Sequence, residues 1–193
     1  TATISDGTNT GSALSYTVTV TDATEIIILD GQTGSVAEDA SVGDAVMTVS
    51  ITDSTPTAIL FSAGNADGIF AIATSGAVTI ADATNLDYET TASYTLTIVA
   101  YDASSSDVAD ITITITDAND APTLATAQAD ASTAEDSLYT LDVSGNFADA
   151  DSGDTLSYSA TGMPTTMTMT TAGVLSGTPL NADVGAHTVV VTA

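Results

Sequence analysis

A strict alternation of apolar residues with threonine limits the folds open to this chain. In the segment DITITITDAND, residues 110–120, isoleucine holds every second position from Ile111 to Ile115, with threonine between. A period of two places the apolar side chains on one face of a β-strand and the hydroxyl groups on the other. Residues branched at Cβ also favour strands. The segment therefore predicts a strand that packs its isoleucines into a core and exposes its threonines.

Related segments return about 95 to 97 residues apart, in the same order in both copies. The pairs are 15–25 with 110–120, 36–39 with 133–136, and 74–78 with 171–175. A repeat of this length indicates tandem modules. Gly, Asp, Asn and Ser separate the short apolar stretches, which is typical of an all-β sandwich of about seven strands.

We expect a complete module at 23–119, preceded by the C-terminal strands of a truncated module at 1–22. We expect residues 120–193 to form a third module, truncated before its last strand, because HTVVVTA (187–193) aligns with YTLTIVA (94–100). In the middle module we expect strands at 26–29, 45–52, 58–63, 69–73, 77–81, 92–101 and 108–116. Its fourth and fifth strands form a hairpin in which Gly76 takes positive φ.

The charge of the chain excludes several classes of partner. There are 25 acidic residues and no Lys or Arg, which gives a formal net charge of −25. Nucleic acid and anionic membranes need basic side chains, and no apolar run is long enough for direct membrane insertion. The acidity fits a surface adapted to high salt, a set of cation sites, or both.

Ligands suited to calcium follow the strand at 108–116. Asp117, Asn119 and Asp120 precede Pro122 in the segment DANDAP. Calcium prefers about six to eight oxygen ligands, from carboxylates, amides and backbone carbonyls. Neighbouring side chains of one strand point to opposite faces, so other loops must complete such a site.

The middle module resembles a cadherin repeat. It carries VAED (36–39), LDYE (86–89), AYD (100–102) and DANDAP (117–122) in the order of that family. The third module, with FADADSGDTLSYSATGMP and AGVLSGTP, resembles the dystroglycan-type cadherin-like module, or the bacterial putative-Ig module. The resemblance implies tandem Ig-like and cadherin-like Greek-key β-sandwiches in an extended array.

The resemblance also implies Ca²⁺ as a cofactor and a ligand set at the second junction. That set is Glu38, Asp87, Glu89, Asp117, Asn119, Asp120, Asp149 and Asp151. Asp154 either joins the site or closes the turn SGD, and both interpretations stay open. The first junction, Asp22 to Glu25, has Thr24 and Glu25 where the family has asparagine and aspartate, so we expect weaker binding or fewer ions there.

No catalytic motif is present, and we expect no enzyme activity; His187 is interpreted as a structural or surface residue. The leading hypothesis is a calcium-rigidified spacer of a large repetitive extracellular protein at the cell surface, similar to bacterial giant adhesins, in cell adhesion or surface-structure assembly. The alternatives are a carbohydrate-binding module and a self-associating filament or sheath subunit. The expected partners are neighbouring modules of the same chain, with the same protein in trans or a surface glycan as further candidates.

Overall fold

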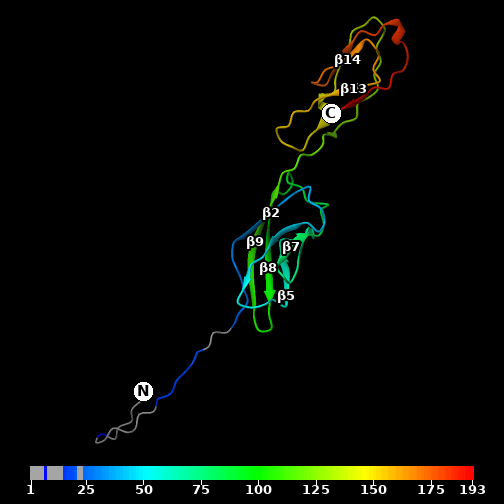
Figure 1. Cartoon of the computed structure of the whole chain (residues 1–193). Coiled ribbons are helices and arrows are strands. Elements are labelled where there is room, and N and C mark those ends of the chain that lie inside the picture. Colours follow the sequence, from blue (N-terminus) through cyan, green and yellow to red (C-terminus); the bar gives the residue numbers. More distant parts are fainter. Residues whose placement is uncertain (1–6, 8–14, 21–23) are drawn as a thin grey trace. The chain divides into compact units, whose positions relative to one another are not determined.

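The computed structural model describes residue 7, residues 15–20 and residues 24–193 (Figure 1). The chain divides into two compact units. The first holds the described residues up to Ser35, together with Ser41–Asn85 and Tyr94–Thr114, and the second holds Val36–Ala40, Leu86–Ser93 and Ile115–Ala193. The short segments around Glu38 and Glu89 thus group with the C-terminal part of the chain.

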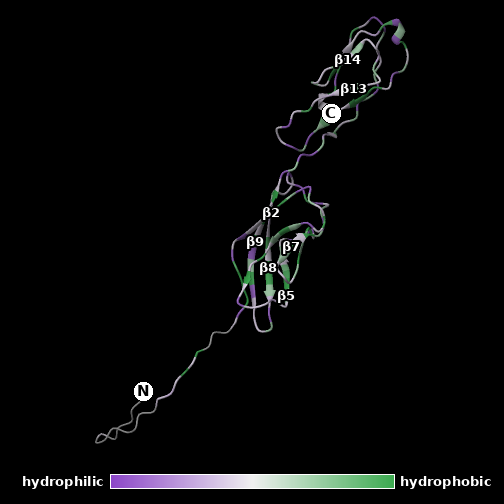
Figure 2. Cartoon of the chain, viewed as in Figure 1, coloured by the Kyte–Doolittle hydropathy of each residue, from purple (hydrophilic) through white to green (hydrophobic). Residues whose placement is uncertain are grey.

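The middle module is built from nine strands. They are β1 (Ile27–Ile28), β2 (Gln32–Ala37), β3 (Ala45–Thr48), β4 (Ile51–Thr52), β5 (Ala58–Ala63), β6 (Phe70–Ile72), β7 (Ala77–Ile80), β8 (Ser93–Tyr101) and β9 (Ser106–Thr116). One sheet has the strand order β2-β9-β8-β5 and another the order β3-β7-β6, while β1 pairs with β4. Figure 2 shows that strongly hydrophobic segments lie within these strands.

The predicted alternation along β9 is confirmed. Ile111, Ile113 and Ile115 are each 0% exposed, whereas Thr114 and Thr116 are exposed. The isoleucines belong to a core to which both sheets contribute. An edge-to-face contact between the rings of Phe70 on β6 and Tyr94 on β8, with centroids 5.3 Å apart, joins the two sheets.

The predicted hairpin at Gly76 is also confirmed. Strands β6 and β7 pair antiparallel, and Gly76 has a φ of 84°. Its N–H donates to the carbonyl oxygen of Ala73 at 2.8 Å, and its own carbonyl accepts the N–H of Val49 at 2.8 Å. A side chain would be strained at this φ, so glycine is required by the turn.

Two predictions for the middle module are wrong in detail. Strand β2 was not among the expected strands, because the segment Gln32–Ala37 has no clear apolar period. In the structure none of its residues is fully buried. The single strand expected at 45–52 is instead two, since β3 pairs with β7 and β4 pairs with β1. The change of partner is held by Gln32, whose side-chain oxygen accepts the N–H of Ser50 at 2.6 Å.

The strand expected at the end of the 1–22 module is not formed in its described part. Residues 15–20 have no regular secondary structure, and Tyr16, Val18 and Val20 are 80%, 71% and 89% exposed. Strand backbone groups need a paired neighbour, and the described residues supply none for this segment. The other residues of that prediction, including Asp22, lie outside the described residues.

The third module has seven short strands and two 3₁₀ turns. They are β10 (Thr123–Leu124), β11 (Tyr139–Asp142), η1 (Ser144–Asn146), β12 (Phe147–Ala148), β13 (Ser159–Thr161), β14 (Met167–Met169), β15 (Val174–Gly177), η2 (Asn181–Asp183) and β16 (Val190–Thr192). The sheets have the orders β11-β15-β14, β10-β12 and β13-β16. Val143, Tyr158, Met167 and Leu175 form its buried core. No helix in the described part of the chain is long and apolar enough to cross a membrane.

Candidate metal site

Glu38 lies directly after β2 and connects three segments of the chain. Its N–H donates to the carbonyl oxygen of Thr116, the last residue of β9, at 3.1 Å. Its carboxylate accepts two further backbone N–H groups, from Tyr88 to Oε2 at 2.6 Å and from Ala118 to Oε1 at 2.7 Å. The half-buried carboxylate is therefore fixed between the loop at 86–93 and the linker that follows β9.

A cluster of three carboxylates forms around this point. Glu38, Glu89 and Asp117 each place one oxygen within 4.8 Å of the others. Two calcium ligands on opposite sides of one ion are about 4.6 to 5.2 Å apart, so oxygens at this separation can share an ion. The cluster draws on three separate segments, and all three belong to the second compact unit.

Three carboxyl groups at the site are electrostatically unfavourable when ionised. Burial raises the pKa of Glu89, and the negative charges of Glu38 and Asp117 raise it further. The pKa of Asp117 is raised by burial and then by the charge of Asp151. The pKa of Asp120 is raised by burial and then by Glu38 and Asp151. A bound cation would relieve this repulsion.

Asp151 supplies an unpartnered oxygen at the same place. Its Oδ2 accepts the N–H of Asp120 at 2.7 Å. Its Oδ1 is buried and has no hydrogen-bond partner in the described part of the chain. A buried acceptor without a partner is unfavourable, and a coordinated cation is one way to satisfy it. The residues present therefore fit a divalent cation.

The other expected ligands make local hydrogen bonds. Asp87 accepts the N–H and the Oγ1–H of Thr90, both at 2.9 Å, and these bonds lower its pKa. Asn119 donates its side-chain N–H to the carbonyl oxygen of Asp120 at 2.6 Å. Asp149 accepts the N–H of Asp151 at 3.1 Å. The charges of Asp87 and Asp149 nevertheless contribute to the raised pKa of Asp120.

Asp154, for which two roles were open, has features of both. Its N–H donates to the carbonyl oxygen of Asp151 at 3.3 Å, which closes the turn. Its charge also contributes to the raised pKa of Asp117, so its field reaches the cluster.

The N-terminal end of the middle module is organised differently. Ser105 accepts the N–H of Ile26 through its Oγ at 3.0 Å, and Asp107 accepts the N–H of Ile28 through Oδ2 at 2.7 Å. Asp102 accepts the N–H groups of Ser104 and Ser105 at 2.7 and 2.6 Å. Within the described residues no carboxylate cluster like that of Glu38 forms at this end.

One buried carboxylate was missed by the sequence reasoning. Asp183 is 8% exposed and accepts the N–H of Leu180, the N–H of Thr165 and the hydroxyl of Thr166, at 3.1, 3.2 and 2.8 Å. His187 donates its Nε2–H to the carbonyl oxygen of Asp183 at 2.8 Å. The segment NAD carries no spacing signal for this role, because the partners are brought together only by folding.

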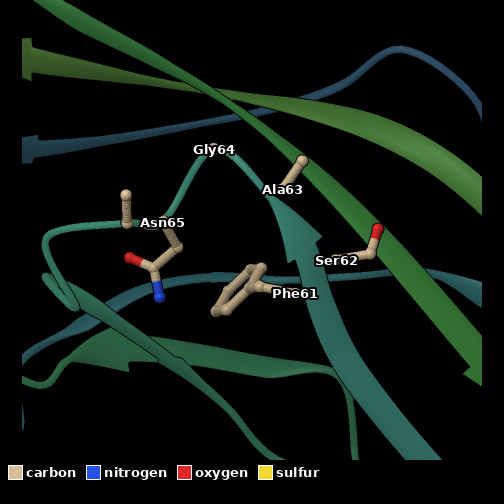
Figure 3. Close-up of a pocket in the computed structure, with 6 residues that line it drawn as sticks. Phe61, Ser62, Ala63, Gly64 and Asn65 are labelled. Atoms are coloured by element: carbon tan, nitrogen blue, oxygen red, sulfur yellow. The ribbon is translucent and has the colours of Figure 1, made fainter.

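A shallow pocket of about 280 Å³ lies at the end of β5 (Figure 3) and is lined by Phe61, Ser62, Ala63, Gly64, Asn65 and Ala66. The amide of Asn65 is engaged with the backbone of Phe70 in both directions, at 2.8 and 3.1 Å. Figure 3 shows the ring of Phe61 and the amide of Asn65 on the same side of the chain. No titratable side chain lines the pocket.

Two family models match the chain. The model of the cadherin domain matches residues 32–116, and the model described as "Putative Ig domain" matches residues 121–193. A comparison with curated proteins gives no match.

Solved cadherin structures share the fold. Mouse cadherin-23 EC22-24 is 25% identical with a TM-score of 0.59, over 87% of this chain and 59% of that one. Human protocadherin-24 EC1-2 is 17% identical with a TM-score of 0.57, over 87% and 94%. Drosophila N-cadherin EC1-4 is 22% identical with a TM-score of 0.56, over 83% and 43%. The chain spans roughly half the length of several such structures. Residues 32–116 are therefore a cadherin domain, residues 121–193 are a putative Ig domain, and the chain carries them in that order.

Proposed function

We propose that this chain binds Ca²⁺ at the cluster of Glu38, Glu89 and Asp117, and that the ion stiffens the connection between its two domains. The observation that carries the proposal is the approach of three carboxylate oxygens, from three segments, to within 4.8 Å of one another. The buried Oδ1 of Asp151, which has no hydrogen-bond partner among the described residues, supports it independently.

The acidic residues would have different roles in such a site. Glu38, Glu89 and Asp117 would hold the ion, with Asp120 and Asp151 as additional carboxylates that are electrostatically coupled to them. Asp87, Asn119 and Asp149 belong to the predicted set and lie on the same loops. When bound, Ca²⁺ supplies positive charge and bonds to several oxygens at once. Segments that otherwise repel one another would then be linked.

The setting that suits such a site is extracellular. Calcium sites of extracellular modules have dissociation constants of about 10⁻⁴ to 10⁻³ M, so they fill outside the cytosol. A cadherin domain is an extracellular module of the adhesion type, and the solved relatives comprise several such domains in one chain. We therefore place the segment at the cell surface, as a spacer of a larger repetitive protein in adhesion or surface-structure assembly.

Calorimetric titration with calcium tests the proposal. The whole chain should show saturable binding in the range of about 10⁻⁴ to 10⁻³ M. Asp117→Asn and Asp151→Asn should each weaken binding by about tenfold or more, because even partners outside the first coordination shell change metal affinity by about 10 to 100-fold. Asp130→Asn, an exposed aspartate of the Ig domain, is the matched control and should bind as the parent does. Absence of saturable binding at about 10 mM calcium would overturn the proposal.

A further inference from the structure

We propose that Glu38 is a positioning residue that fastens the loop at 86–93 to the linker at 117–120 before any metal binds. The inference deepens the proposed calcium site and takes its functional meaning from it. The contacts themselves involve only protein atoms, so they can be tested in the metal-free chain.

The contacts of Glu38 carry the inference. Its two carboxylate oxygens accept N–H groups from Tyr88 at 2.6 Å and from Ala118 at 2.7 Å, and both bonds are partly buried. The donors stand 50 and 80 residues away from Glu38 in sequence. Hydrogen bonds to an ionised carboxylate are short and stronger than those between neutral groups. One side chain thus connects two distant segments.

The positions of the two donors make this connection specific for the site. Tyr88 lies between Asp87 and Glu89, and Ala118 lies between Asp117 and Asn119. Fixing the N–H of the central residue fixes the backbone from which both neighbouring side chains project. The two hydrogen bonds of Glu38 therefore position the four expected ligands that flank Tyr88 and Ala118.

The fastening does not remove Glu38 from the ligand set. A carboxylate has about four lone-pair sites on its two oxygens, and two N–H donors occupy two of them. The remaining sites can face a cation. Because the loops are already held, the ordering that binding would otherwise require is reduced, which favours affinity.

Amide hydrogen exchange followed by NMR in excess chelator tests the proposal on the whole chain. Glu38→Ala removes both acceptors, so the amides of Tyr88 and Ala118 should each exchange about tenfold faster or more, since a hydrogen bond to a charged group is strong. Glu38→Gln keeps one acceptor oxygen and places an NH₂ group at the other position. It should therefore release one of the two amides and leave the other protected.

Two internal controls separate this role from a general loss of structure. Glu89→Gln removes a neighbouring charge of the same cluster and should leave both amides unchanged. The amide of Ile113, in the centre of β9, should stay protected in every variant, which shows that the domain is folded.

The outcomes distinguish this inference from the proposed function. Unchanged exchange of Tyr88 and Ala118 in Glu38→Ala, with Ile113 protected, would overturn the fastening even if calcium binds the parent chain. Accelerated exchange in a chain that binds no calcium would support the fastening and refute the calcium site. A merely structural effect would release Ile113 and both loop amides together in Glu38→Gln, and that result would also overturn the inference.

Discussion

The same residue type performs opposite roles at different places in this chain. Asp183 is surrounded by donors, so its ionised form is stabilised, and the N–H of Leu180 is the first cause of its lowered pKa. Burial raises the pKa values of Asp117 and Asp120, and the charges of the carboxylates around them raise these values further. The number of donors facing a carboxylate decides between a structural bond and a group that needs a cation.

Substitution of Asp183 should lower the stability of the Ig domain in a pH-dependent manner. The lowered pKa means that the native state favours the charged carboxylate more than the unfolded state does. The stabilisation that Asp183 gives to the folded state is therefore present above the pKa of the unfolded state, about 3.9. It is lost as the pH falls through the lower pKa of the folded state. Asp183→Asn should unfold at lower urea concentration than the parent at pH 7, and the difference should shrink as the pH falls toward about 2. Equal urea midpoints at pH 7, with Asp130→Asn as control, would contradict this role.

The sequence predicts the candidate site better than it predicts this structural carboxylate. Glu38, Glu89 and Asp117 stand in segments that match a family pattern in order, and the structure brings their oxygens together. Asp183 has no such pattern. Its partners, Thr165 and Leu180, meet it only through the path of the chain in the third module.

For the strands, the reliable signal was an alternation of apolar and polar residues in which the apolar residues are buried. Strands β8 and β9 agree closely with the ranges expected at 92–101 and 108–116, because their inward residues are large and fully buried. Strand β2 was missed because its position is set by pairing with β9 rather than by its own apolar residues. The division of 45–52 into β3 and β4 likewise depends on a contact with Gln32, which local pattern cannot show.

The turn between β6 and β7 should be sensitive to any side chain at Gly76. A Cβ atom there would lie 2.5 Å from the carbonyl oxygen of Val49, at a φ of 84°. Gly76→Ala should therefore lower the free energy of unfolding by about 1 to 3 kcal/mol. Gly68→Ala is the matched control, because its φ is 70° and a Cβ atom added there would have no neighbouring atom within 4 Å. It should lose only about 1 kcal/mol, the ordinary penalty of left-handed backbone. Equal urea midpoints for the two variants would show that the contact with Val49 is unimportant.

For the whole molecule, the absence of Lys and Arg means that no acidic side chain can form an ion pair with either of these residues. The formal net charge of −25 must be balanced by ions from solution. Simple screening by salt lowers all such repulsion over a Debye length of about 8 Å at 0.15 M. A specific site acts differently, because it neutralises a few chosen carboxylates and also links the loops that carry them. The two mechanisms differ in their dependence on the identity of the cation.

Small-angle scattering of the whole chain should distinguish them. Proposed calcium binding predicts that calcium at a few times its dissociation constant, about 10⁻³ M, narrows the range of particle dimensions relative to chelator. Sodium chloride at matched ionic strength should not reproduce this change, because it screens charge without joining the loops. Asp120→Ala and Asp149→Ala should reduce the calcium response, while Asp130→Ala should retain it. If sodium reproduces the response, or if all three variants respond as the parent does, the acidic residues act through general screening and the cluster at Glu38 does not stiffen the chain.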